Sequence, residues 1–246
     1  MIPIQKILPR QATTMMQQAG DNNMHALTPE QLESYHNEER KKHALEMKKR
    51  KSNSVVEMFN HSGIPLRHQQ CGFNNFIIDS DDKKKAFNIT QGYINNFNEN
   101  YRLGRGLLML GPPGTGKTHL AAAICKDAIR QDYTALFTGT LDAIQIIKQS
   151  YEKNSGYSER EAINKFVVND LLVLDEVGVQ HQTDAERVYL SEIINKRYEH
   201  MKPTILLSNL NVGELTKCVG QRIIDRMRHV NEIVVFNWQS HRGNKL

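Results

Sequence analysis

The stretch GPPGTGKT, residues 111 to 118, decides the fold of this chain. A short apolar run precedes it, and apolar residues at helical spacing follow it. A strand buried on both faces and a helix are therefore expected on its two sides. Glycines let backbone N–H groups close around a phosphate, and the N-terminus of the helix adds partial positive charge. The stretch predicts a P-loop for ATP or GTP, with an ordinary glycine turn as the alternative.

Every residue of this loop is predicted to contact the nucleotide. The residues are Gly111, Pro112, Pro113, Gly114, Thr115, Gly116, Lys117 and Thr118. Lys117 is expected to reach the β and γ phosphates, and the Thr118 hydroxyl to ligate Mg²⁺. The expected ligand is therefore a nucleoside triphosphate with its magnesium ion.

The composition limits the class of protein. The chain has 246 residues, of which 39% are hydrophobic, so one full domain with an appendage can fold. Its net charge of +5 makes an anionic partner plausible. Three separated cysteines without a C-x-x-C pair indicate a reduced compartment. No stretch reaches the roughly 20 apolar residues of a membrane span, so we expect a cytoplasmic protein without membrane contact.

The N-terminal part differs from the rest of the chain. The run Thr28 to Gln31 carries N-capping signals, which predict a helix from Pro29 to about Lys51 with a basic second half. Its sparse apolar residues fit a solvated linker, docking on a protein partner, or contact with nucleic acid. A shorter helix is expected at Val55 to Phe59. We predict a small α-helical N-terminal domain and basic linker over residues 1–66, followed by an ATPase domain over residues 67–246.

Five short apolar runs alternate with helical patterns after this boundary. They are Gly106 to Leu110, Thr134 to Phe137, Leu171 to Leu174, Thr204 to Leu207 and Glu232 to Phe236. Such alternation predicts an α/β fold with a five-stranded parallel sheet covered by helices on both faces. Ligands of these folds bind at the carboxyl ends of the strands.

Two acidic residues follow the third apolar run, in the sequence LLVLDEVG. Their place at the end of a buried strand points them toward the phosphate loop. Asp175 is expected to hold the Mg²⁺ shell, and Glu176 to orient and deprotonate the attacking water. An Asp-Glu pair also occurs in plain turns, but the strand position and the preceding P-loop both favour a catalytic role. The pair favours hydrolysis, with phosphoryl transfer by a kinase as the alternative.

The fourth run and the helix after it add three more candidates. Asn209 ends the run TILLSNLN, where its amide would reach the γ-phosphate or the water, although Asn is also an ordinary turn residue. Arg222 and Arg226 lie four residues apart, on one helix face. A guanidinium from a neighbouring subunit suits the γ-phosphate, and a solvated helix paired with Asp225 is the alternative. The first reading requires self-assembly.

These motifs together resemble one family. The segments GPPGTGKT, LLVLDE, ILLSN, GQRIIDRMR and FNWQSHR are similar to those of AAA+ ATPases of the DnaC, DnaI and IstB type. The resemblance covers roughly residues 60–242. It implies ATP and Mg²⁺ as cofactors, Asn209 as sensor 1, and Arg226 as the arginine finger with Arg222 as the second choice. Only 20 residues follow Arg226, which implies that the C-terminal helical lid is missing.

A two-helix insertion is expected at about residues 140–168. Ser158 and Glu161 form a capping box that starts its second helix. The resemblance implies that this insertion lines a spiral assembly and meets single-stranded DNA. Its basic and aromatic residues suit phosphate contact and base stacking, although a solvated basic face is the plainer alternative. They are Lys148, Lys153, Arg160 and Lys165, with Tyr151 and Tyr157.

The resemblance leads to one functional prediction and two competitors. It implies an ATP-dependent loader of the hexameric, DnaB-like replicative helicase onto single-stranded DNA. The loader would dock the helicase through its N-terminal helices and assemble into an ATP-bridged oligomer. The first competitor is an IstB-type ATPase that assists DNA transposition. The second is an adaptor that binds the helicase without hydrolysing ATP.

Overall fold

The computed structural model describes residues 40–41, 54–152, 155–179 and 183–241. The chain divides into two compact units, Met1–Lys51 and Ser52–Leu246. In the first unit, Arg40 and Lys41 are helical and exposed, and the rest of the helix predicted from residue 29 lies outside the described residues. The predicted domain division at residues 66 and 67 therefore stays a prediction.

The second unit is built on five parallel strands, as predicted. They are β1 (Leu107–Leu110), β2 (Ala135–Gly139), β3 (Leu171–Asp175), β4 (Thr204–Ser208) and β5 (Glu232–Val235). Their order across the sheet is β2-β3-β4-β1-β5. The central strands β1 and β4 are buried along their whole length, which explains their uninterrupted aliphatic sequences. Both are in register through Leu107 with Ile205 and Leu110 with Ser208.

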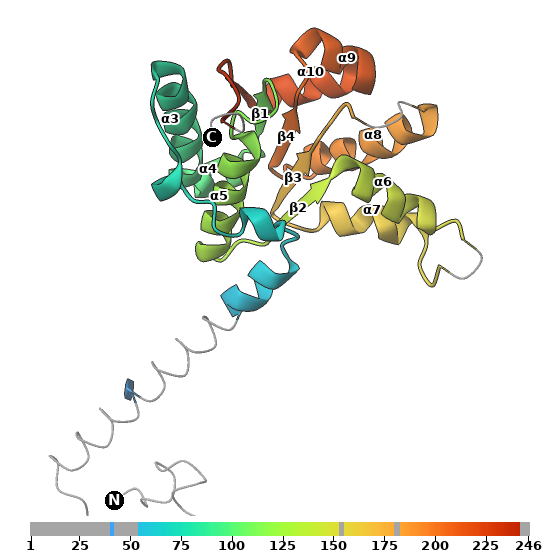
Figure 1. Ribbon diagram of the computed structural model, residues 1–246. Coiled ribbons are helices and arrows are strands. Elements are labelled where there is room, and N and C mark those ends of the chain that lie inside the picture. The colour runs from blue at the N-terminus through green and yellow to red at the C-terminus, as the bar shows by residue number, and fades with distance from the viewer. Residues whose placement is uncertain (1–39, 42–53, 153–154, 180–182, 242–246) are drawn as a thin grey trace, which may run out of the picture. The chain divides into compact units, whose positions relative to one another are not determined.

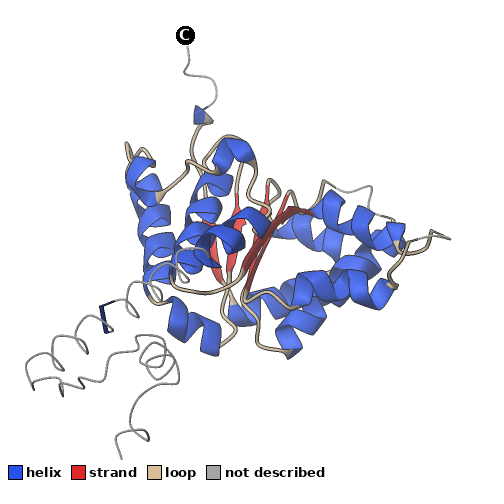
Figure 2. Ribbon diagram, turned by 90° about the horizontal axis from the view of Figure 1, so that it is seen from below, coloured by secondary structure: helices blue, strands red, loops and turns tan. Residues whose placement is uncertain are grey.

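Helices cover both faces of this sheet (Figures 1 and 2). One core contains side chains from α3 (Asp81–Asn95), α4 (Phe97–Arg102) and α5 (Lys117–Arg130). The other contains side chains from α6 (Thr140–Gln149), α7 (Glu159–Val167), α8 (Asp184–Glu199), α9 (Val212–Val219) and α10 (Gln221–Val230). Successive β1 residues alternate between the two cores, Leu107 in the first and Leu108 in the second, as the period of a strand requires.

The segment before α3 packs onto the first core. The predicted helix at Val55 to Phe59 is present and spans residues 54–61. After it, Ser62 accepts a hydrogen bond at its carbonyl from Phe137 N–H at 2.6 Å, which caps the outer edge of β2. Gly63 has a φ of 69° there, and a Cβ at this position would lie 2.3 Å from the Phe137 carbonyl oxygen. Two short 3-10 turns, η2 (Leu66–His68) and η3 (Phe73–Asn75), then lead to α3.

Three further predictions concern the two helices at about residues 140–168, the missing C-terminal helical lid and the lack of a membrane-spanning helix. The two helices predicted over about residues 140–168 are present as α6 and α7, and α7 begins at the predicted capping box of Ser158 and Glu161. That they form an insertion stays a prediction. No α-helix follows β5 within the described residues, which end at His241. None of the described helices is long and apolar enough to cross a membrane.

Candidate nucleotide-binding site

The P-loop joins the end of β1 to the start of α5, as the sequence predicts. Gly116 is the residue before α5 and has a φ of 95°, a conformation that side chains disfavour. A Cβ at Gly116 would also lie 2.7 Å from Cε2 of Phe76. Glycine is therefore required here both by the backbone turn and by the aromatic ring packed against it.

Lys117 lies across the inside of the loop. Its Nζ donates hydrogen bonds to the carbonyl oxygens of Gly111 at 2.5 Å and Pro112 at 2.7 Å, and the residue is 6% exposed. Thr115 braces the same turn by donating from Oγ1 to the Pro112 carbonyl at 2.8 Å. The ammonium group is thus held where the loop surrounds its ligand.

Thr118 and Asp175 meet although they are far apart in the sequence. The Thr118 hydroxyl donates to Oδ2 of Asp175 at 3.0 Å, which joins the start of α5 to the end of β3. Thr140 fixes the strand end by donating to the Asp175 carbonyl at 2.8 Å. A hydroxyl and a carboxylate are ligands that fit Mg²⁺. Among the described residues no group of three His, Cys, Asp or Glu could hold a metal, so Mg²⁺ here would also need phosphate and water oxygens.

Glu176 and Asn209 are both exposed at the carboxyl ends of their strands. Glu176 has a φ of 59°, which is uncommon for a residue with a side chain. Its N–H donates to Oδ1 of Asp175 at 2.7 Å, so the two acids form one turn. Asn209 follows β4, and because Leu110 pairs with Ser208, it lies level with Gly111 at the start of the loop.

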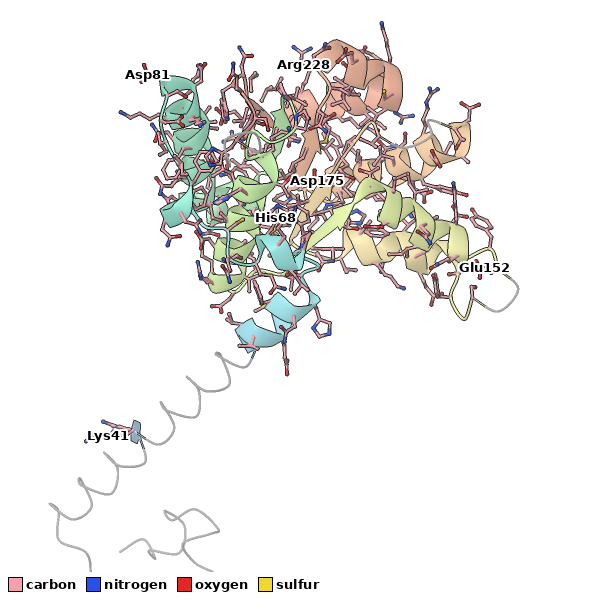
Figure 3. All side chains as sticks on the ribbon, viewed as in Figure 1. Lys41, His68, Asp81, Glu152, Asp175 and Arg228 are labelled. Atoms are coloured by element: carbon pink, nitrogen blue, oxygen red, sulfur yellow. The ribbon has the colours of Figure 1, made fainter. Side chains whose placement is uncertain are left out.

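Arg222 and Arg226 lie on α10 and differ in their surroundings. The guanidinium of Arg226 packs over the ring of Tyr198 on α8, 5.4 Å from its centroid. Its Nη1 atom is buried and has no hydrogen-bond partner. Arg222 is exposed. Figure 3 shows Arg228 of the same helix at one end of the unit, away from Asp175. Arg226 thus faces Tyr198 in its own chain.

Four of the predicted DNA contacts in the insertion, Lys148, Lys165, Tyr157 and Tyr151, have partners within the chain. Nζ of Lys148 forms an ion pair with Oε1 of Glu186 at 2.8 Å, and Glu186 is 1% exposed. Nζ of Lys165 lies 4.2 Å from the centroid of the Tyr157 ring. Arg160 is exposed. Tyr151 is also exposed, and Lys153 lies outside the described residues.

Sequence reasoning missed the segments that support the loop from outside. Phe76 packs against His119 with ring centroids 5.4 Å apart, and the ring nitrogen Nε2 of His119 lies 2.9 Å from the Gly72 carbonyl oxygen. The indole Nε1–H of Trp238, which follows β5, donates a hydrogen bond to the Thr115 carbonyl. Trp238 lies in FNWQSHR, one of the motifs that carry the resemblance, but nothing in that motif indicates a contact with the loop. No sequence motif around Phe76 predicts its contact with the loop.

Comparison with known proteins identifies one family and relatives that share one name. Residues 12–245 match the family described as IstB-like ATP binding protein. The replicative helicase loader DnaC of Escherichia coli strain K12 is 37% identical over 201 residues, which are 81% of this chain and 80% of that protein. The protein of the same name from Buchnera aphidicola subsp. Baizongia pistaciae is 33% identical over 80% of this chain and 79% of its own length.

Solved structures show the same fold. The crystal structure of the DnaC helicase loader superposes with a TM-score of 0.64 at 25% identity, over 70% of this chain and all of that one. AMPPCP-bound DnaA from Aquifex aeolicus has a TM-score of 0.60 at 23% identity, over 73% of this chain and 53% of that one. The arrangement of sheet, loop and helices is therefore that of a P-loop AAA+ domain.

Proposed function

Because the chain belongs to the family of IstB-like ATP binding proteins, we propose that it uses ATP to load the hexameric replicative helicase onto single-stranded DNA. The observation that carries this proposal is the 37% identity with the DnaC loader over about four fifths of both chains. The P-loop, its acid pair and the fold lie within one unit and supply the ATP-binding part of that task. Loading, hydrolysis and assembly are the parts that experiments must test.

The residues around the loop support the proposed hydrolysis. Thr118 and Asp175 would hold Mg²⁺, which neutralises charge on the phosphate oxygens. Glu176 stands next to Asp175 and is exposed, so it can take the proton of an attacking water. Asn209, level with the start of the loop, would orient that water or the γ-phosphate. When a triphosphate binds, Lys117 exchanges its two carbonyl acceptors for phosphate oxygens.

Assembly would complete the site. Arg226 is directed at Tyr198 in its own chain, and Arg222 is exposed on the same helix. In this proposal one of the two guanidinium groups acts on the nucleotide of a neighbouring subunit. Arg226 would first leave Tyr198, where its Nη1 atom has no acceptor. A γ-phosphate would supply that missing acceptor.

Single-stranded DNA is the proposed second ligand. Lys148 and Lys165 are engaged with Glu186 and Tyr157, so they are poor candidates for phosphate contact. Arg160 is exposed and offers a cation. Tyr151 is exposed and offers a stacking ring, which would exchange its neighbour Tyr189, 6.3 Å away between ring centroids, for a base. The proposed DNA contact of the insertion therefore rests on Arg160 and Tyr151.

Co-purification with the replicative helicase of the same cell tests the main proposal. We expect the full chain to retain the helicase and to promote its transfer onto single-stranded DNA with ATP. A chain lacking residues 1–60 should bind ATP but lose the helicase. Helicase association that persists without residues 1–60 would contradict the proposed N-terminal docking. A full chain that never retains the helicase would refute the loader function.

An IstB-type ATPase that assists DNA transposition is the second candidate, because the matched family carries that name. It predicts a preference for duplex DNA, whereas a helicase loader should protect single strands in footprinting. A non-hydrolysing adaptor is the remaining competitor. Equal and negligible ATP turnover in the wild type and in Glu176→Gln, measured with helicase and DNA, would favour the adaptor.

A further inference from the structure

Two consecutive carbonyls of the P-loop accept hydrogen bonds from the segment after β5. The indole Nε1–H of Trp238 donates to the Thr115 carbonyl at 3.0 Å. The backbone N–H of His241 donates to the Gly114 carbonyl at 2.9 Å. This segment, dark red in Figure 1, thereby contacts the loop between β1 and α5.

These contacts determine the direction of the loop's N–H groups. In a planar trans peptide the C=O and the following N–H point in opposite directions. When Trp238 holds the Thr115 carbonyl outward, the N–H of Gly116 is turned to the opposite side. His241 has the same effect on the N–H of Thr115 through the Gly114 carbonyl. Inward N–H groups are what a phosphate-binding loop offers its ligand.

Trp238 is itself anchored to the sheet. Its ring contacts Phe236 with centroids 5.0 Å apart, and Phe236 is completely buried. The Phe236 N–H donates to the Leu110 carbonyl at 2.7 Å, at the end of β1. A Cβ on Gly111 would lie 2.2 Å from the Phe236 carbonyl oxygen, so the two segments pack without space between them. The indole donor is therefore fixed relative to the strand that leads into the loop.

We propose that Trp238 is a positioning residue for ATP binding, which holds the P-loop in its phosphate-binding conformation through the hydrogen bond from Nε1 to Thr115. The indole does not touch the nucleotide. It lowers the cost of binding because the loop is already ordered when ATP arrives. The inference depends on ATP binding at this loop and is independent of helicase loading.

The experiment uses the fact that Trp238 is the only tryptophan of the chain. Expression with β-(3-benzothienyl)alanine in place of tryptophan replaces the indole N–H by sulfur and keeps the ring shape. We expect the dissociation constant for Mg-ATP, measured by calorimetry, to rise about threefold to tenfold, the effect of one net hydrogen bond. Trp238→Phe, which keeps an aromatic contact with Phe236, should raise it by at least as much.

A matched control separates positioning from folding. Tyr133→Phe removes the hydrogen bond from the Tyr133 hydroxyl to Oδ1 of Asn98 at 3.2 Å, a contact that involves no loop residue. It should leave ATP affinity unchanged. A benzothienyl protein with wild-type ATP affinity, whatever its melting temperature, would overturn the proposal. A wild-type protein that binds no ATP would overturn the nucleotide site itself, and failure to bind a helicase would affect neither result.

Discussion

Arg197 is completely buried, and replacing it by methionine should strongly destabilise the second unit, Ser52–Leu246. Its guanidinium lies within hydrogen-bond distance of six acceptors, five of them backbone carbonyls at the end of α7 and at the entrances of β3 and β4. Because Arg has five N–H groups and Nη1 has three of these acceptors, one N–H of Nη1 is shared between two carbonyls. The acceptors are Phe166 at 2.8 Å, Val167 at 3.2 Å, Asn169 at 2.9 Å, Asp170 at 3.3 Å, Pro203 at 2.6 Å and the Thr204 hydroxyl at 3.0 Å.

The magnitude follows from two opposing effects. Burial lowers the pKa of Arg197 to about 9, so the guanidinium is still charged at neutral pH. Removing the buried charge also removes its desolvation penalty of several kcal/mol, which by itself would stabilise the folded state. The opposing effect is the loss of hydrogen bonds from a charged donor, each worth about 1.5–3 kcal/mol, which leaves the accepting carbonyls buried without a donor. The loss is larger, and we expect Arg197→Met to reduce the free energy of unfolding by about 3–5 kcal/mol.

The neighbouring residue supplies the control. Lys196 is 34% exposed at its side chain and forms an ion pair with Glu192 within α8. Lys196→Met should change the free energy of unfolding by no more than about 1 kcal/mol, because exposed ion pairs contribute little. Urea denaturation followed by circular dichroism measures both variants. A loss below about 1 kcal/mol for Arg197→Met would refute the reasoning, since the carbonyls would then have found other donors.

Three further changes test the site and its surroundings. Glu176→Gln should keep ATP affinity but lower the turnover rate about 10²-fold or more in a phosphate-release assay, because the general base is lost. If Arg226 is the trans finger, Arg226→Ala should abolish assembly-stimulated turnover while Arg222→Ala retains it, and the reverse result would assign the role to Arg222. Burial raises the pKa of the Asp170 carboxyl, but hydrogen bonds, chiefly from Lys202, outweigh it and hold the pKa below 3.8. The charged Asp170 carboxylate therefore stabilises the fold above pH 3.8, and this stabilisation is lost as pH falls through the folded pKa. Asp170→Asn should lower the melting temperature at pH 7. In strong acid, where Asp170 is protonated, the variant and the wild type should have the same melting temperature.

The central strands β1, β3 and β4 were predictable because they are buried on both faces for almost their whole length. The sequence Leu107 to Leu110 has no polar residue, and the register of β1 with β4 and β5 leaves no position facing water. The predicted strand at Leu171 to Leu174 extends by one residue to Asp175, since its last residue still pairs with Gly139 of β2. Local pattern is sufficient where burial is uniform.

The position of Asp175 and Glu176 was predictable for a related reason, whereas the contacts of Trp238 and Phe76 with the P-loop were not. Parallel strands end at one edge of the sheet, so Asp175 was expected to lie near Thr118, the last residue of the loop. The contacts of Trp238 and Phe76 depend instead on the paths of irregular segments, which no periodicity describes. The same limit applies to Lys148, whose partner Glu186 lies 38 residues away on α8. A basic residue in a sequence does not reveal whether a buried carboxylate already binds it.

The structure divides the proposed reaction between what one chain provides and what it lacks. Arg197 fixes the entrances of β3 and β4, and Thr140 and Ser208 fix their exits, by hydrogen bonds to Asp175 and Val177. The acid pair is therefore positioned before any partner arrives. The arginines of α10 are not, because Arg226 is directed at Tyr198 in its own chain. ATP binding should therefore require one chain, and fast hydrolysis a second chain that supplies the guanidinium. This division is what a loader needs if ATP is to promote assembly and its hydrolysis is to follow assembly.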